Sequence, residues 1–260
     1  MSESIRAVDR ALDILLCFSN QTPQLTMTQI AERVGMNKST VHRLLGTLER
    51  RRFVQRNPTT GYYQLGIRLL QMAYLTLGHN DIRRHAEPFL HRLCERHRET
   101  ITLSVLDDAD VVFLDVIESP QRVKLAASVG QRMPAFSTAA GKALLAYLPA
   151  DTVLRILERG MPQFTSHTIR TKEGVLADLQ RIHEQGFSIA MQEYEEGINA
   201  VASPVLNSAN LPIAAVTVTG PAYRMTREQM LEIGPSVREI SQLIAREVEL
   251  ASEPEIRLES

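Results

Sequence analysis

The stretch TMTQIAERVGMNKSTVHRLLGTLERRRFVQR, residues 26–56, decides the fold of the N-terminal part of the chain. It contains two short segments with apolar residues at helical spacing, joined near Gly35, and glycine suits the positive φ that ends a helix. The second segment predicts a helix over residues 38–51. Its apolar face, spaced i, i+3, i+4 and i+7, must point to a core. The residues on that face are Val41, Leu44, Leu45 and Leu48.

The flanks of this stretch extend the same domain. Residues 4–18 predict an amphipathic helix, because apolar residues recur there at helical spacing. These residues are Ile5, Val8, Leu12, Leu15 and Leu16. Two short β-prone runs on either side of the Pro/Gly turn at residues 57–61 predict a hairpin. Residues 66–78 form a helical pattern too apolar for solvent, so we expect that helix to contact another domain or subunit.

Polar and basic side chains occupy the other face of the helix predicted over residues 38–51. Arginine can bond guanine bidentately, and short hydroxyl side chains reach base edges or phosphate oxygens. The following hairpin then forms a wing beside the sugar-phosphate backbone. The candidate DNA contacts are Thr28, Asn37, Lys38, Ser39, Thr40, His42, Arg43, Thr47, Arg51, Arg56 and Tyr62.

A small helical domain with a charged surface is the alternative to a DNA-binding domain. Gly46 bears on the choice, because a glycine inside a helix costs about 1 kcal/mol relative to alanine. A neighbouring helix or a DNA backbone that approaches closely would explain it. Charge also favours DNA: residues 1–80 contain ten basic and five acidic side chains, whereas the remainder contains 19 basic and 25 acidic ones. Four features together favour DNA binding. They are the turn near Gly35 between the two helical segments, the polar face of the second helix, the hairpin, and the basic excess of residues 1–80.

The rest of the chain mixes strands and helices. The strands are expected at residues 102–106, 111–116, 123–130, 187–191, 198–206 and 213–219. The helices are expected at residues 82–98, 139–148, 151–159, 172–185 and 226–250. Two hairpins among these strands favour an α+β domain with an antiparallel sheet over a doubly wound parallel sheet.

Composition sets broad limits on the class of protein. Hydrophobic content of 44% and charged content of 23% are typical of a globular chain. Two isolated cysteines make neither a disulfide framework nor a Cys-pair metal motif, which favours the reducing cytoplasm. No apolar run approaches the roughly 18 residues that a membrane span needs, and the N-terminus lacks a signal-peptide pattern. We therefore expect a cytoplasmic protein with no membrane partner.

Several blocks of sequence resemble the IclR-type bacterial transcriptional regulators. They are RAVDRALDILLCF, LTMTQIAERVGMNKSTVHRLLGTLERRRFV, GYYQLGIRLL, STAAGKALLAYLP and GINAVASPVLNSANLPIAAVTVTGP. The resemblance implies a winged helix-turn-helix domain over residues 1–65, a linker helix over 66–82, and a GAF/PAS-like effector-binding domain with an antiparallel sheet over 83–255. It also implies homodimers or homotetramers that bind palindromic operators in double-stranded DNA, with repression more common than activation.

The last predicted strand places two hydroxyls on one face, because Thr217 and Thr219 are two residues apart. Threonine is also simply a good strand former, so the strand alone leaves this choice open. The resemblance implies that these hydroxyls bind a small effector, together with the backbone amides of Ala139 and Ala140 at a helix N-terminus. Ala190 and Ala200 stand where related carboxylate-binding proteins have an acidic residue and a cysteine.

We therefore expect a larger and less polar cavity, suited to an aromatic or otherwise apolar compound or acid, with Met133, Phe136 and Met191 as wall residues. Binding of a small acid through other groups, or loss of the ligand, are the alternatives. The function so predicted is ligand-responsive transcriptional regulation, more often repression, of catabolic or efflux genes.

The sequence lacks the marks of an enzyme or a cofactor protein. AAGKA, residues 139–143, lacks the first glycine and the Ser/Thr of a phosphate-binding loop. His91, Cys94 and His97 spread over about 120° of a helix with no fourth ligand, so no metal site is expected. No nucleophile motif is present. The rival hypothesis is a GAF-like ligand-binding or catalytic protein whose N-terminal domain mediates protein contacts only.

Overall fold

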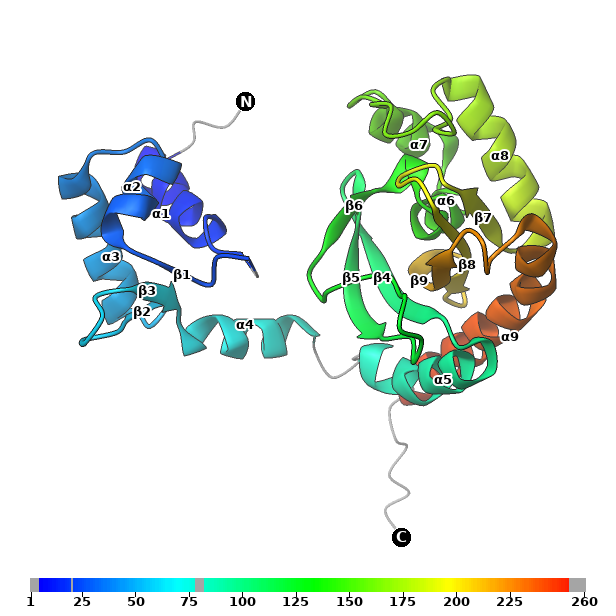
Figure 1. Ribbon diagram of the computed structural model, residues 1–260, viewed down its shortest axis with the longest axis horizontal. Helices are drawn as coiled ribbons and strands as arrows, with labels where there is room; N and C mark the ends of the chain where they lie inside the picture. Colours follow the sequence, from blue (N-terminus) through cyan, green and yellow to red (C-terminus); the bar gives the residue numbers. More distant parts are fainter. Residues whose placement is uncertain (1–4, 20, 78–81, 253–260) are drawn as a thin grey trace, which may run out of the picture. The chain divides into compact units, whose positions relative to one another are not determined.

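The chain separates into two compact units, Met1–His79 and Asn80–Ser260. A computed structural model describes residues 5–19, 21–77 and 82–252 (Figure 1). Each unit has a hydrophobic core of its own, one in the N-terminal unit and two main ones in the C-terminal unit.

The N-terminal unit contains three helices and a small antiparallel sheet. The helices are α1 (Arg6–Leu16), α2 (Met27–Arg33) and α3 (Lys38–Arg50). The sheet has the order β1-β3-β2, formed by Gln24–Leu25, Tyr63–Leu65 and Val54–Arg56. Strands β2 and β3 are the predicted hairpin. Strand β1 lies in a segment for which the sequence predicts no helix or strand, and it pairs with β3 through Gln24–Gln64 and Leu25–Tyr63.

Local hydrogen bonds explain where α2 and α3 begin. Thr26 caps α2 in a capping box, in which the Gln29 backbone N–H donates to Thr26 Oγ1 and the Thr26 N–H donates to Gln29 Oε1. Gly35 takes a φ of +61° between the helices. Asn37 then caps α3, because its Oδ1 accepts from the Thr40 N–H at 2.9 Å.

Of the apolar stripe that predicts α1, only Leu15 packs against the core of this unit. Ile14 is fully buried, whereas Ile5, Val8, Leu12 and Leu16 are at least half exposed. Helix α4 (Ile67–Leu77), which corresponds to the predicted linker helix, also exposes Ile67, Leu70 and Met72. The expected ends of the linker at 78–81, of the first helix at Ser4 and of the effector domain at 253–255 lie outside the described residues.

The C-terminal unit is built on one six-stranded antiparallel sheet of order β6-β5-β4-β9-β8-β7. The strands are β4 (Thr100–Asp107), β5 (Asp110–Ile117), β6 (Arg132–Pro134), β7 (Ser188–Met191), β8 (Ile198–Leu206) and β9 (Pro212–Pro221). This is the α+β arrangement with an antiparallel sheet that the sequence predicts.

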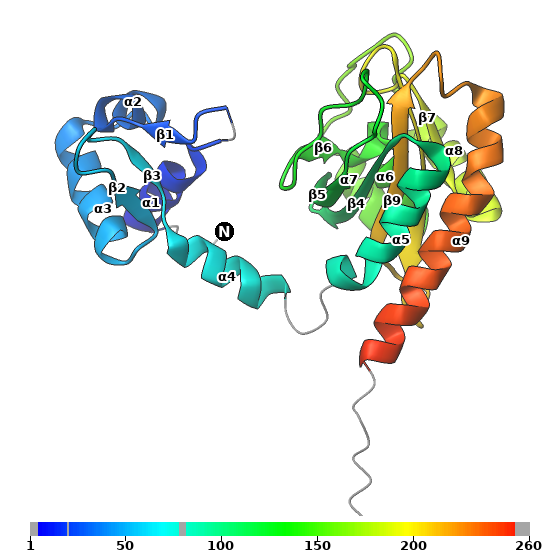
Figure 2. The ribbon, with the colours of Figure 1, turned by 60° about the horizontal axis from the view of Figure 1, so that its bottom comes forward.

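Helices cover both faces of this sheet. Helices α5 (Ile82–His97) and α9 (Arg227–Ser252) lie side by side on one face (Figure 2). Helix α6 (Ala139–Leu145) packs on the other face against β8 and β9. Helices α7 (Ala150–Leu157) and α8 (Lys172–Gln185) join α6 in the core on that side. Because α6 follows directly on a short 3-10 turn at Ala135–Ser137, its first residues are held against the middle of the sheet.

The strand predicted over residues 123–130 is wrong. The pairing with β5 begins only at its end, where the Gly130 N–H donates to the Phe113 carbonyl and the Phe113 N–H donates to the Gln131 carbonyl. Strand β6 therefore starts at Arg132, and residues 123–130 form no strand. The apolar side chains of this segment do not form one face of a strand. Val123 and Val129 are exposed, and Leu125 lines a pocket.

Within the described part of the chain, no helix is both long and apolar enough to cross a lipid bilayer.

Candidate nucleic-acid interface and effector pocket

Helix α3 presents a polar face to solvent. Val41 and Leu45 are fully buried on its inner side. Lys38, Ser39, His42, Arg43 and Thr47 are exposed, and Thr40 is half-buried. Within the described residues, the side chains of Lys38, His42 and Arg43 form no hydrogen bond or ion pair. Their donor groups are therefore available to an external partner.

Three of the predicted DNA contacts also have a role inside the helix. Ser39 Oγ donates to Asn37 Oδ1 at 2.9 Å, so both side chains belong to the N-cap. Thr47 Oγ1 donates to the Arg43 carbonyl at 3.1 Å and accepts from Arg50 Nη2 at 3.3 Å. Arg50 follows Arg43 by seven residues and so shares its face, which the i, i+7 spacing of the sequence could have indicated.

The wing is a short hairpin with an ordered turn. Asn57 Oδ1 accepts from the backbone N–H groups of Thr59 and Thr60, and Gly61 takes a φ of +75°. The Arg56 guanidinium lies 5.7 Å from the centre of the buried Tyr63 ring.

The remaining predicted contacts flank α3. Tyr62 on the wing and Arg51 at the end of α3 are exposed, whereas Thr28 on α2 is half-buried. The predicted DNA contacts therefore come from α2, α3 and the hairpin of one compact unit.

The C-terminal unit contains a pocket with a volume of about 60 Å³ between the sheet, the start of α6 and the segment that joins β7 to β8. Seven of the predicted effector-binding residues line it. They are Met133, Ala139, Ala140, Ala190, Ala200, Thr217 and Thr219. The residues that sequence reasoning did not select are Thr102, Val111, Phe113, Leu125, Ser137, Thr138, Glu193, Tyr194, Glu195 and Ile198.

Two predicted wall residues, Phe136 and Met191, do not line this pocket. Phe136 is buried in the core around α6 to α8, with its ring 6.1 Å from that of Phe164. Met191 follows Ala190 on β7, and successive strand residues point to opposite faces. Since Ala190 faces the pocket, Met191 packs instead with the core on the side of α5 and α9.

The floor of the pocket consists of small side chains on four neighbouring strands. Thr102 on β4 pairs directly with Thr217 on β9. Ala200 on β8 pairs with Thr219 on β9 and with Ala190 on β7. The alternation Thr100, Thr102, Ser104 along β4 was the sequence signal that could have indicated Thr102, because it places hydroxyls on one face.

Four buried polar atoms among the residues that line the pocket have no hydrogen-bond partner within the described part of the chain. They are Thr102 Oγ1, Ser137 Oγ, Glu193 Oε2 and Thr217 Oγ1. Buried polar groups in native proteins are nearly always hydrogen-bonded, so such a group requires an explanation.

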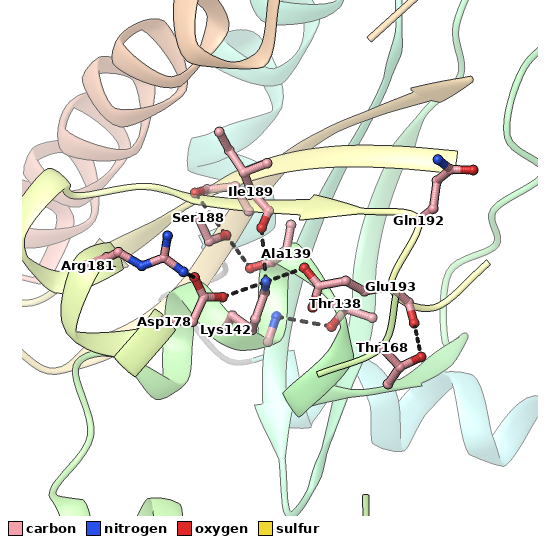
Figure 3. Close-up of polar contacts among 12 residues, drawn as sticks. Thr138, Ala139, Lys142, Thr168, Asp178, Arg181, Ser188, Ile189, Gln192 and Glu193 are labelled. Carbon is pink, nitrogen blue, oxygen red and sulfur yellow. Dashed lines mark hydrogen bonds and ion pairs between the residues drawn. The ribbon is translucent and has the colours of Figure 1, made fainter. Parts of the chain in front are cut away.

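A buried ion cluster lies beside the pocket (Figure 3). Lys142 on α6 is fully buried, and its Nζ donates to Asp178 Oδ2 at 2.8 Å, to the Ile189 carbonyl at 2.9 Å and to Glu193 Oε1 at 2.6 Å. These bonds use all three donors of the ammonium group. Arg181 contacts the other oxygen of Asp178 at 2.7 Å. The glycine and lysine of AAGKA therefore belong to a packed helix, as the sequence predicts.

Burial raises the pKa of Glu193 above its usual value, and the charge of Asp178 adds to this effect. The charge and hydrogen bond of Lys142 act in the opposite direction. Two threonines hold the backbone here: Thr168 Oγ1 donates to the Glu193 carbonyl at 2.7 Å, and Thr165 Oγ1 donates to the Gln192 carbonyl at 2.6 Å. Glu193 is therefore fixed at the pocket by both its side chain and its backbone.

Across the described residues, no group of three or more His, Cys, Asp or Glu side chains is placed to hold a metal ion. His91 is exposed, and His97 Nε2 is bonded to Ser236 Oγ at 2.8 Å.

A helix-turn-helix with a wing, joined to a domain with an internal pocket, defines a DNA-binding regulator that carries a sensor domain. Residues 7–58 match the model of the IclR helix-turn-helix domain, and residues 74–246 match that of the bacterial transcriptional regulator IclR C-terminal domain. The chain belongs to the IclR family of bacterial transcriptional regulators. It is a DNA-binding transcriptional regulator and not an enzyme. This match excludes the alternative that the N-terminal domain mediates protein contacts only and does not bind DNA.

Individual relatives are similar in sequence to this chain over most of their length. The HTH-type transcriptional regulator XynR of Escherichia coli is 33% identical over 238 residues, which cover 88% of this chain and 94% of the relative. The transcriptional repressor IclR of the same organism is 27% identical over 250 residues, which cover 95% of this chain and 90% of the relative. The crystal structure of an IclR-type regulator from Alicyclobacillus acidocaldarius superposes with a TM-score of 0.81 at 30% identity, covering 95% of this chain and all of that one.

Proposed function

We propose that α3 reads base edges in the major groove, with Arg43 as the principal side chain and the wing on the adjacent backbone. The observation that carries this assignment is the set of free donors on one exposed helix face, Lys38, His42 and Arg43. Asn37, Ser39, Thr40 and Thr47 shape that face, while Thr28, Arg51, Arg56 and Tyr62 border it. Bidentate arginine–guanine contact supplies specificity, and the flanking groups position the helix through phosphates.

Charge reversal tests this assignment. Arg43→Glu should abolish specific operator binding in a fluorescence anisotropy assay, because one base contact is lost and a carboxylate meets the DNA. Arg246→Glu, an equal change at an exposed position on α9, is the matched control and should bind as the wild type does. Equal operator affinity of Arg43→Glu and wild type would exclude Arg43 as a reader. Wild-type affinity should also fall steeply with salt, since phosphate contacts release counterions.

We infer that two copies of the chain act together on a palindromic operator. The support is the exposed apolar stripe of α1 and the exposed apolar residues of α4, which a second copy would cover. A two-fold pair of winged units places its recognition helices in successive major grooves, about 34 Å apart. A homotetramer would be a pair of such dimers.

The C-terminal pocket is the proposed effector site, with Met133, Ala139, Ala140, Ala190, Ala200, Thr217 and Thr219 on its walls. A small organic molecule bound there would favour one of two arrangements of the DNA-binding units, by an amount limited by its differential affinity for them. We propose that the protein acts in the cytoplasm as a repressor of genes for the breakdown or export of that molecule. The support for repression is that one relative is itself named a repressor.

A further inference from the structure

A second cleft lies on the opposite side of β7 from the proposed effector pocket. Successive strand residues point to opposite faces, and Ala190 lines the pocket whereas Ile189 and Met191 line the cleft. The cleft has a volume of about 280 Å³, compared with about 60 Å³ for the pocket. Its walls are α8, β7 and the beginning of α9, and Glu193 lines both spaces. The cleft is therefore a separate space, close to the lower end of the range of small-molecule sites.

Two exposed arginines line this cleft, Arg181 on α8 and Arg227 at the beginning of α9. Arg181 Nη2 donates to Asp178 Oδ1 at 2.7 Å, which leaves most of its five N–H donors free among the described residues. Within the same residues Arg227 forms no hydrogen bond or ion pair, and its neighbour Glu228 is not part of the lining. Both guanidinium groups therefore have donors available to an external partner.

The carboxylates of the cleft are already bonded to cations. Asp178 lies between Lys142 and Arg181, with one oxygen bonded to each (Figure 3). Glu193 Oε1 accepts from Lys142 at 2.6 Å. Three cationic groups thus accompany two carboxylates, and Arg227 is the cation that no described carboxylate contacts. Arg227 is also the first residue of α9, where the helix dipole adds partial positive charge. The balance favours an anion over a cation as the partner.

The rest of the lining is largely apolar. Its apolar side chains are Ile169, Ile182, Ile189, Met191 and Leu231. Leu231 is 46% exposed, so an apolar group placed over it would remove hydrophobic surface from water. A partner that combines a charged group with a short apolar part therefore fits this cleft better than an inorganic ion does.

We propose that the cleft binds a small organic anion, with its carboxylate or phosphate group held between Arg181 and Arg227. The apolar part of the anion packs on Met191 and Leu231. Guanidinium groups bond both kinds of oxyanion, often through two parallel N–H···O bonds. The site goes beyond the proposed function, because it is separate from both the effector pocket and the DNA-binding unit.

Calorimetric titration of the full-length protein without DNA tests the ligand class. Butyl phosphate and butyrate carry the two oxyanions on the same carbon chain, and 1-butanol is their uncharged counterpart. At least one anion should bind in the millimolar range, and the alcohol should not. The anion that binds more tightly distinguishes a phosphate from a carboxylate ligand. No binding of either anion at millimolar concentration, or equal binding of 1-butanol, would overturn the proposal.

Substitutions locate the bound anion. Arg227→Gln removes the charge of a side chain without a partner, so the melting temperature of the free protein should not change. It should weaken anion binding about fivefold, as expected for loss of a charge-assisted hydrogen bond at an exposed site. Arg181→Gln should act in the same direction. Arg246→Gln, at an exposed position elsewhere on α9, is the matched control and should keep wild-type affinity.

Two results of these substitutions would contradict the proposal. Binding of the anion in the effector pocket would leave its affinity unchanged in both Arg181→Gln and Arg227→Gln. An equal loss of affinity in Arg246→Gln would show that net charge alone, and not the cleft, attracts the anion. Either result overturns the anion site and leaves the proposed function intact, because operator binding by the wild-type protein without any anion tests that function separately.

Discussion

Glu193 is the residue at which the pocket and the buried ion cluster meet. One of its carboxylate oxygens is bonded to Lys142 and the other has no partner. The Lys142 ammonium contacts both Asp178 and Glu193, Arg181 contacts only Asp178, and burial raises the pKa of Glu193. The chemical state of Glu193 therefore affects both the stability of the domain and the hydrogen bonds open to a ligand.

Glu193→Gln should make the stability of the protein less dependent on pH. Burial raises the pKa of Glu193 above its usual value of 4.5. The stabilisation from its bound proton is complete below pH 4.5 and is lost as pH rises through the raised pKa. The melting temperature of Glu193→Gln relative to wild type should therefore increase with pH above 4.5, as measured by circular dichroism. Glu195→Gln, at an exposed neighbouring position, is the control; a difference that shrinks with pH would contradict the assignment.

Gly46→Ala should stabilise the protein and weaken its binding to DNA. Among the described residues, a Cβ atom at Gly46 would meet no atom within 4 Å apart from its chain neighbours and the backbone of its own helix, so none of the described neighbouring helices explains this glycine. Alanine should add about 1 kcal/mol of stability in a helix interior. If DNA approaches the helix there, the added methyl group should reduce operator affinity. Chemical denaturation and fluorescence anisotropy measure the two effects, and unchanged operator affinity would indicate that the glycine has no role in DNA contact.

Single residues were predictable where they belong to a periodic pattern. The buried Val41 and Leu45 and the exposed Arg43 follow from helical spacing, and Thr217 and Thr219 follow from strand alternation. Phe136 was placed in the pocket wrongly because the 3-10 turn before α6 depends on tertiary contacts. Met191 was placed there wrongly because strand alternation puts it on the face opposite to Ala190, and only tertiary contacts decide which of these two faces lines the pocket. The position of Glu193 at the pocket depends on threonines more than twenty residues earlier, which no local pattern reveals.

At the scale of elements, the start of α3 depends on Asn37. Asn37→Ala should lower the free energy of unfolding by about 1 kcal/mol, because the Thr40 N–H loses its acceptor. Asn37→Ser, which can also cap a helix, should remain close to wild type. Urea denaturation measures both variants. Equal stability of Asn37→Ala and wild type would show that the cap contributes nothing.

Most helices and long strands could be predicted because their signals are local. The predicted strand over 198–206 and the predicted helix over 172–185 agree with β8 and α8. The short edge elements could not be predicted. Strand β1 has two residues and exists because β3 supplies a partner 40 residues away, while residues 123–130 have a strand-like composition but no ladder.

At the scale of the whole molecule, the exposed stripe of α1 predicts self-association. Leu12→Glu places a charge in that stripe and should shift the protein towards monomer in sedimentation velocity experiments, with weaker operator binding. Leu176→Glu, at an exposed leucine on α8, is the matched control and should sediment as the wild type does. An unchanged sedimentation coefficient for Leu12→Glu would locate the contact between copies elsewhere.

The burial of Lys142 has a consequence for how the C-terminal unit opens. Its ammonium group connects α6, α8 and β7 with the turn that follows, so none of these segments can detach without exposing an unpaired charge inside the domain. Local fraying is therefore disfavoured, and these segments should open together as one cooperative unit. The region around the proposed effector pocket should then unfold and refold as one unit, although its parts lie up to about fifty residues apart in the chain.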